Sequence, residues 1–179
     1  QMWFAPWFSD RAGFRSDHWN SHYAANEGAD TSSTSLGQKQ DTYNPTVSLL
    51  DTPNENTMVY FNWAESTTPI GLYVTNSSEP LRPTNAGFKP ERSSLYEIGA
   101  KYNAFNGRMG FTVSAFRLEK GNSLLTDPTS GEVTSSSDRQ RNQGVELSAS
   151  GEILKNWNVI GTYAFYDART LAGAAADVG

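Results

Sequence analysis

Cysteine is absent from the 179 residues of this sequence, and only two histidines, His18 and His22, are present. Without cysteine the chain can form no disulfide bond, no thiolate nucleophile and no cysteine-ligated metal site. Two histidines spaced in this way share one side of a strand but lie too far apart there for one metal ion. We therefore predict no metal site and interpret both histidines as exposed residues near a loop.

Long apolar runs and positive charge are also scarce. The sequence has no stretch of about eighteen consecutive apolar residues, which excludes a membrane-spanning helix. Lysine and arginine number 14 against 19 aspartate and glutamate, and the resulting net charge of -5 disfavours nucleic acid as a partner. Nucleophile motifs and glycine-rich phosphate loops are missing too, so we expect no enzyme and assign no catalytic residue.

Alternation with a period of two is the pattern that the sequence does have. In residues 95–103, Tyr96, Ile98 and Ala100 alternate with Glu97, Gly99 and Lys101. Such alternation is typical of a β-strand with two unlike faces. The same pattern predicts four consecutive strands, at residues 95–103, 109–119, 143–151 and 156–168.

The connections between these strands alternate in length. Only residues 104–108, with the turn pair Asn106-Gly107, join the first strand to the second, and a short run around Asn156 joins the third to the fourth. Residues 121–141, rich in serine, threonine and aspartate, separate the second from the third. Short turns alternating with long loops are typical of an outer-membrane barrel, with the turns in the periplasm and the loops outside the cell.

The first half of the chain predicts three further strands. They cover residues 11–23, with a bulge or an early loop expected near His18 and Trp19, residues 41–50, which contain Pro45, and residues 57–66. Residues 24–40 and 67–94 are predicted as loops outside the cell, as are residues 121–140, and residues 51–56 as a periplasmic turn. The predicted fold is all-β, an antiparallel transmembrane β-barrel segment of about seven up-and-down strands from a larger plugged barrel.

The phase of the alternation predicts which side chains face lipid and which face the barrel lumen. Arg117 takes an apolar position after Ala115, so we expect that its strand either bulges there or has left the membrane, and we prefer the second because a mid-membrane arginine costs about 2–4 kcal/mol. Lumen-facing positions are predicted for Arg15, Asp17, Glu97, Lys101 and Glu146, with Thr162 beside them. Lipid-facing positions are predicted for Tyr96, Ile98, Ala100, Val113, Val145, Leu147, Val159 and Tyr163.

Several blocks of this sequence resemble the TonB-dependent siderophore receptors of Gram-negative outer membranes. The blocks are Lys89-Pro90-Glu91 followed by Tyr96-Glu97-Ile98-Gly99-Ala100-Lys101, then Asn106-Gly107-Arg108, Phe116-Arg117-Leu118, Gln143 to Gly151, and Trp157 to Arg169. Their order and spacing match the family over roughly residues 41–169. The resemblance implies a multi-pass outer-membrane receptor that imports an iron–siderophore complex and is energised through TonB.

The resemblance also implies partners and a domain assignment. Residues 1–179 would form part of a single barrel domain, without the plug domain, and the partners would be a ferric siderophore, the receptor's own plug, TonB and outer-membrane lipid. No covalently bound cofactor is expected. Because ferric siderophores are usually anionic, cationic and aromatic residues in or beside the loops are candidate ligand contacts: Tyr73, Arg82, Lys89, Arg92, Arg139 and Arg141. A passive porin-like channel and a soluble secreted β-sandwich that binds through its loops are the alternatives.

Overall fold

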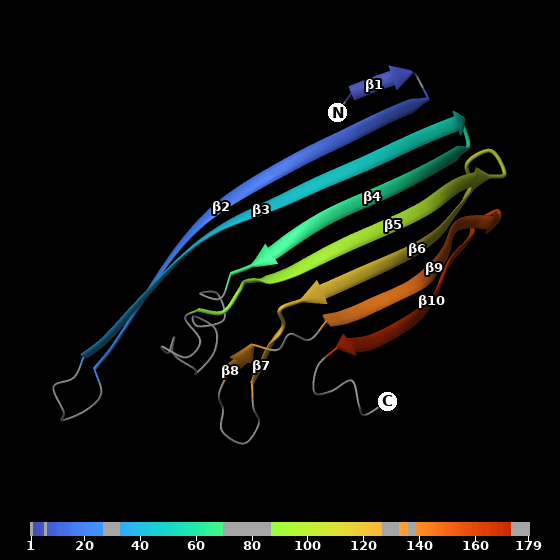
Figure 1. Ribbon diagram of the computed structural model, residues 1–179. Coiled ribbons are helices and arrows are strands. Elements are labelled where there is room, and N and C mark those ends of the chain that lie inside the picture. The colour runs from blue at the N-terminus through green and yellow to red at the C-terminus, as the bar shows by residue number, and fades with distance from the viewer. Residues whose placement is uncertain are drawn as a thin grey trace.

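The computed structural model describes residues 2–5, 7–26, 33–69, 87–126, 133–135 and 139–172, and every regular element in these ranges is a β-strand (Figure 1). A short strand, β1 (Met2–Ala5), lies at one edge of the main sheet. Seven long strands follow it: β2 (Phe8–Asn26), β3 (Ser33–Asn54), β4 (Thr57–Thr68), β5 (Glu91–Ala104), β6 (Met109–Gly121), β9 (Arg139–Leu154) and β10 (Trp157–Ala172). Within these ranges no helix is long and apolar enough to cross a membrane.

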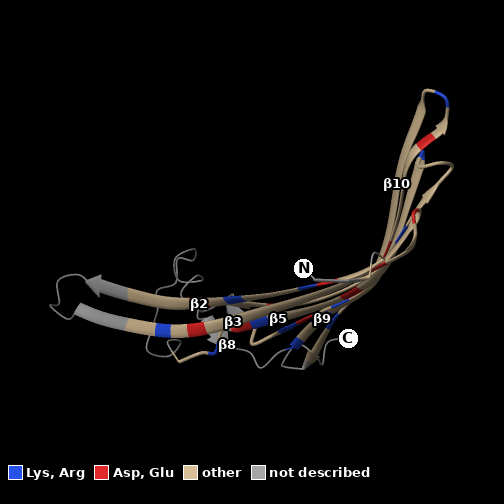
Figure 2. Ribbon diagram, turned by 90° about the horizontal axis from the view of Figure 1, so that it is seen from above, with Lys and Arg blue, Asp and Glu red and all other residues tan. Residues whose placement is uncertain are grey.

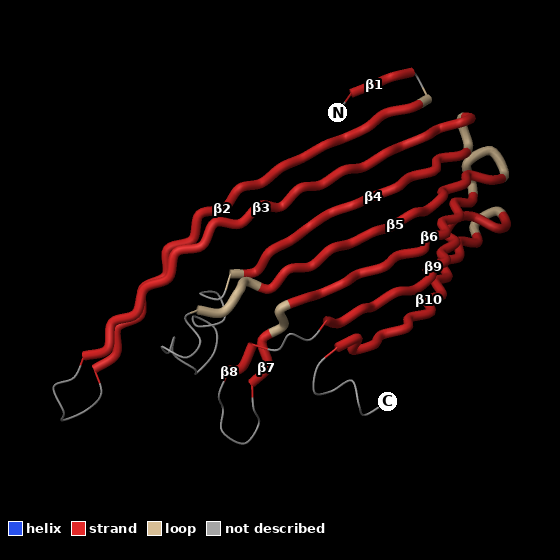
Figure 3. Tube along the Cα trace, viewed as in Figure 1, coloured by secondary structure: helices blue, strands red, loops and turns tan. Residues whose placement is uncertain are grey.

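The main sheet is an antiparallel meander, in which strands that follow one another in the sequence lie side by side. Its order is β1-β2-β3-β4-β5-β6-β9-β10. Short turns lie at one end of the strands, the turn end, and the longer connections lie at the other, the loop end (Figure 3). The predicted all-β, up-and-down antiparallel fold is confirmed, with seven long strands. Two short strands, β7 (Leu124–Thr126) and β8 (Val133–Ser135), add a separate hairpin within the segment predicted as a loop.

The first hairpin is much longer than the sequence pattern indicated. The β2–β3 ladder runs without a register shift from Phe8 opposite Asp51 to Asn26 opposite Ser33, so the prediction of a bulge or an early loop near Trp19 is wrong. Much of the predicted loop 24–40 is also strand, because backbone hydrogen bonds continue a ladder whatever the side chains are. In Figure 1 this hairpin extends well past the loop ends of the neighbouring strands.

Pro45 lies inside β3, opposite Phe14 of β2. The pairing of β3 with β4 begins at the next residue, Thr46, which lies opposite Ala64. Proline is tolerated in a strand where one side needs no ladder hydrogen bond. The strand predicted through Pro45 is therefore confirmed, and it continues in both directions.

Cross-strand register assigns the apolar residues to one face of the sheet. Ala100, Val113, Leu147 and Tyr163 are successive partners across β5, β6, β9 and β10, and we call their side the apolar face. All the residues predicted to face lipid lie on it: Tyr96, Ile98, Ala100, Val113, Val145, Leu147, Val159 and Tyr163. On this face Ile98 is 56% and Tyr163 is 63% exposed, so the face is open to its surroundings.

The opposite side of the sheet, which we call the polar face, carries Lys101, Thr112, Ser148 and Thr162 as successive partners. Among the described residues, Met109 is the only large hydrophobic side chain that is buried, and Pro69 is buried as well. A soluble sandwich would need a second layer packed against the apolar face. The described part of the chain has no such layer, so the sandwich alternative finds no support here.

Arg117 keeps the register of its strand. The β5–β6 ladder has no shift between the pair Arg92 and Gly121 and the pair Ala104 and Met109, so β6 contains no bulge after Ala115. Arg117 therefore lies on the apolar face, toward the loop end, as expected of a strand that has left the membrane. This end of the apolar face thus lies beyond its apolar segment.

Gly151 of β9 lies where two strands approach closely. Its φ of 143° falls in the region that favours glycine, and the amide of Glu152 donates a 2.9 Å hydrogen bond to the carbonyl oxygen of Arg108. A Cβ at position 151 would lie 2.0 Å from that same carbonyl oxygen. Only glycine fits here without moving the backbone.

Replacing Gly151 by alanine should therefore destabilise the sheet. We expect the free energy of unfolding to fall by about 1–3 kcal/mol in urea unfolding of the protein in lipid vesicles, followed by tryptophan fluorescence. Gly161→Ala is the matched control, because no atom lies within 4 Å of a Cβ at that position. Equal stability of the two variants would contradict the strain at Gly151.

Candidate functional site

A tyrosine holds a carboxylate in the middle of the polar face. The hydroxyl of Tyr60 in β4 donates a 2.7 Å hydrogen bond to Oε1 of Glu97 in β5. Nζ of Lys101 lies 5.8 Å from the centroid of the Tyr60 ring. The ring covers Gly99, where a Cβ would come within 2.5 Å of it. Glycine at position 99 thus lets the tyrosine lie across the neighbouring strand and reach Glu97.

The same arrangement recurs between β9 and β10. The hydroxyl of Tyr166 donates a 2.8 Å hydrogen bond to Oε1 of Glu146, and the Tyr166 ring lies 5.7 Å from that of Phe116. Below them, a Cβ at Gly144 would lie 2.2 Å from the carbonyl oxygen of Phe165 and 3.0 Å from the Tyr166 ring. Glu97 and Glu146 are each held by one tyrosine, and neither forms an ion pair within the described residues.

The polar face carries a third cluster near its first edge. Nε of Arg15 and the side-chain amide of Asn44 donate hydrogen bonds of 2.8 Å and 2.9 Å to Oδ2 of Asp17. The register places every residue predicted to face the lumen on this polar face: Arg15, Asp17, Glu97, Lys101 and Glu146. Charges of both signs are interspersed along the strands (Figure 2).

At the loop end, β6, β9 and β10 form a small cavity of about 270 Å³. Lys120, Gln140, Asn142 and Thr170 line it from the polar face. Arg141 and Arg169 also border it, although their register places them on the apolar face. Nζ of Lys120 also lies 2.9 Å from the nearly buried carboxylate of Glu91. Sequence reasoning missed these residues because it ended the strands too early. Residues 139–142 are all polar, so the sequence shows no alternation between apolar and polar residues that could have signalled the longer strand.

The four described residues among those predicted to contact a ligand do not form one site. Tyr73 and Arg82 lie outside the described residues. Lys89 and Arg92 line a second cavity of about 270 Å³, together with Tyr43 and Asn122. The remaining two, Arg139 and Arg141, lie in β9 rather than in a loop.

Three of these cations lie on the side of the apolar face rather than on the polar face. Arg92 forms an ion pair with Glu65, and both residues follow the apolar-face register of β4 and β5. Arg141 lies opposite Glu119, which belongs to the same face, and Arg139 donates a 3.0 Å hydrogen bond to that glutamate. Their ligand contacts remain a prediction, but the register does not place these arginines on the polar face.

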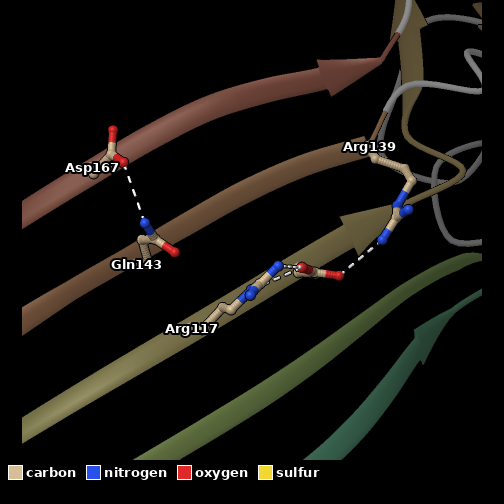
Figure 4. Close-up of polar contacts among 5 residues, drawn as sticks. Arg117, Arg139, Gln143 and Asp167 are labelled. Carbon is tan, nitrogen blue, oxygen red and sulfur yellow. Dashed lines mark hydrogen bonds and ion pairs between the residues drawn. The ribbon is translucent and has the colours of Figure 1, made fainter.

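A band of charged residues crosses β6, β9 and β10 beyond the loop end of the apolar segment (Figure 4). Nε of Arg117 donates a 2.9 Å hydrogen bond to Glu119, which thereby holds both Arg117 and Arg139. Nε of Arg169 and the amide of Gln143 donate to Asp167 at 2.8 Å and 3.3 Å. We call this band the arginine border: Arg117, Glu119, Arg139, Arg141, Gln143, Asp167 and Arg169.

The arginines lower the pKa values of the two carboxyls in the border. The hydrogen bond from Arg117 is the main cause that lowers the pKa of Glu119, and the hydrogen bond from Arg169 lowers that of Asp167. Both carboxylates therefore stay ionised below the usual pH range of such groups. Elsewhere in the described residues, no three histidine, aspartate or glutamate side chains gather in a way that could hold a metal ion.

Aromatic side chains lie at both ends of the apolar face. Tyr102, Phe111 and Trp157 lie toward the turn end and are exposed. Tyr96 and Phe165 lie toward the loop end, just before the arginine border. An apolar band between two aromatic girdles is the surface expected of a β-barrel wall that faces lipid.

Comparisons with known proteins agree with this geometry. The chain is 34% identical over 110 residues to the metal-pseudopaline receptor CntO of Pseudomonas aeruginosa, covering 58% of this chain and 15% of CntO. It is 32% identical over 118 residues to the probable TonB-dependent siderophore receptor PiuA of Acinetobacter baumannii, covering 64% of this chain and 16% of PiuA. The chain thus spans about one sixth of the length of these relatives, and both are named as receptors rather than enzymes.

Solved structures show the same fold. The crystal structure of PiuA superposes with a TM-score of 0.76 at 25% identity, over 92% of this chain and 23% of PiuA. The closed form of the ferric-catecholate import receptor Fiu of Escherichia coli K12 superposes with a TM-score of 0.74 at 24% identity, over 94% of this chain and 26% of Fiu. Residues 11–179 match the family model described as TonB dependent receptor-like, beta-barrel. The chain belongs to this family of TonB-dependent receptor barrels.

Proposed function

We propose that this chain is part of the barrel wall of a receptor that imports a ferric siderophore across the outer membrane and is energised through TonB. Barrels of this family are outer-membrane proteins of Gram-negative bacteria. PiuA and Fiu are named as siderophore or ferric-catecholate receptors, and CntO as a receptor for a metal complex of pseudopaline. The names of these relatives support a metal chelate as the ligand class, and a siderophore as its commonest form.

The observation that carries the proposal is the contrast between the two faces of the sheet. The apolar face suits lipid, whereas the polar face carries carboxylates, tyrosine hydroxyls and amides that need water or a polar partner. In a closed barrel the polar face lines the lumen. Glu97 and Glu146 each accept a hydrogen bond from one tyrosine, and neither forms an ion pair with a cation among the described residues. Each carboxylate can therefore accept further hydrogen bonds from a basic surface inside the barrel. We infer that the plug domain supplies that surface.

The loop-end cavity of the polar face is the proposed route of the ligand past this part of the wall. Lys120 supplies positive charge, while Gln140 and Asn142 supply amide donors and acceptors. An anionic ferric complex entering the lumen from outside the cell would pass these residues at the loop end of β6, β9 and β10. By contrast, Arg139 faces the other side of the wall and should not meet a ligand in the lumen.

Single cysteines can test the orientation of the strands in the outer membrane. Single cysteines at Gly87 in the long β4–β5 connection and at Glu55 in the β3–β4 turn should react differently in intact cells, because both sites are exposed but lie at opposite ends of the strands. An impermeant thiol reagent should label Gly87→Cys and spare Glu55→Cys. Lysed cells provide the control, in which both positions should react. The reverse pattern in intact cells would contradict the orientation.

Another prediction concerns import. In cells whose only route for a siderophore is this receptor, ⁵⁵Fe uptake should be tested with catecholate, hydroxamate and mixed siderophores, and it should stop when TonB is deleted. Lys120→Gln should weaken uptake of the transported complex about tenfold at subsaturating concentration, the value of one charge-assisted hydrogen bond. The matched control is Arg139→Gln. Arg139 lies at the loop end of β9 but on the apolar face, so this variant should leave uptake unchanged. Uptake that persists without TonB would favour the passive channel instead.

A further inference from the structure

We propose that Arg141 and Arg169 bind a phosphate group of an anionic membrane lipid on the outward side of the barrel wall. The two residues are directly opposite partners on β9 and β10. They follow the register of Leu147 and Tyr163, so they belong to the apolar face and not to the lumen. Like charges directly opposite each other destabilise a sheet. An anion bound between the two guanidinium groups would replace this repulsion with attraction.

The charge balance of the arginine border also calls for an anion. Within the described residues the border contains four arginines, Arg117, Arg139, Arg141 and Arg169, but only two carboxylates. Glu119 is shared by Arg117 and Arg139, and Asp167 is held by Arg169. Arg141 is the one arginine of the border that forms no ion pair within the described part of the chain.

The side chain of Arg141 has an unused hydrogen-bond donor, and its charge helps to lower the pKa of Asp167 without forming an ion pair with it. Its Nε atom is buried, and no acceptor for it is found among the described residues. Leaving a buried donor of a charged group unpaired is costly, and a guanidinium pairs with a phosphate through two parallel hydrogen bonds. Arg169 is already held by Asp167 through Nε. Its terminal nitrogens remain suited to a second acceptor on the outer side.

The position of the pair favours a lipid over a free phosphate ion. Val145 and Phe165 lie four residues nearer the turn end on the same face, and they are 40% and 59% exposed. Four residues of a strand tilted by about 45° rise by about 9 Å. This height is close to the depth of a lipid head-group layer, about 5–8 Å on each side of the bilayer. One lipid could thus place its acyl chains on the apolar face and its phosphate at the arginines.

Lipid binding to the purified full-length receptor in detergent tests the proposal. Phosphatidic acid is the probe because it carries a phosphate monoester, and phosphatidylcholine is the reference lipid, with native mass spectrometry as the readout. Replacing Arg141 and Arg169 by glutamine should weaken phosphatidic acid binding about fivefold for each arginine. Arg15→Gln, which removes an arginine from the polar face, is the matched control and should leave binding unchanged.

A second variant tests the proposal in the opposite direction. Asp167→Asn removes the carboxylate that competes for Arg169, so it should tighten phosphatidic acid binding several-fold. Unchanged affinity in this variant would overturn the proposal even if the double arginine variant failed to fold. Full binding by a folded double variant, or an equal loss with Arg15→Gln, would also overturn it. Displacement of the lipid by inorganic phosphate at millimolar concentration would show a free-anion site and overturn the assignment to lipid.

Discussion

The register of the β-ladder is the constraint on which the rest of this structure depends. Because side chains alternate strictly along a strand, one slip by a single residue would exchange the two faces of that strand. Glu97, Lys101 and Glu146 would then lie among apolar residues that face lipid, at a cost of about 2–4 kcal/mol for a basic residue at the midplane and less for an acidic one. The ladders of the four strands β4, β5, β6 and the central part of β9 show no shift across the apolar segment.

Glycine and tyrosine reinforce this register on the polar face. Tyr60 can lie over Gly99 only when those two residues are direct partners, and they are. The hydrogen bond from Tyr60 to Glu97 then fixes the rotation of the ring. Tyr166 over Gly144 repeats the arrangement between β9 and β10. Packing of a bulky ring on the backbone of a glycine thus distinguishes the native register from a shifted one. Backbone hydrogen bonds alone would not make this distinction.

The sequence predicted the membrane-facing part of the fold well, because alternation is strongest where lipid contacts one face. The grouping of Ile98, Val113 and Leu147 on one side, and of Glu97 and Glu146 on the other, follows from that alternation alone. Strand ends were predicted less well, since beyond the membrane either face can be polar and the period of two loses its contrast. For this reason Arg139 and Arg141 were assigned to a loop, and Lys120, Gln140 and Asn142 were not recognised as a group that shares one face.

The length of the β2–β3 hairpin has a consequence for how such a receptor can change over evolutionary time. Its ladder continues to Asn26 opposite Ser33 through backbone hydrogen bonds, which do not depend on the identity of the side chains. Substitutions along its distal part can therefore change the chemistry of this surface while the shape of the projection is retained. The hairpin can thus diverge in sequence without disturbing the pairing of the strands beside it.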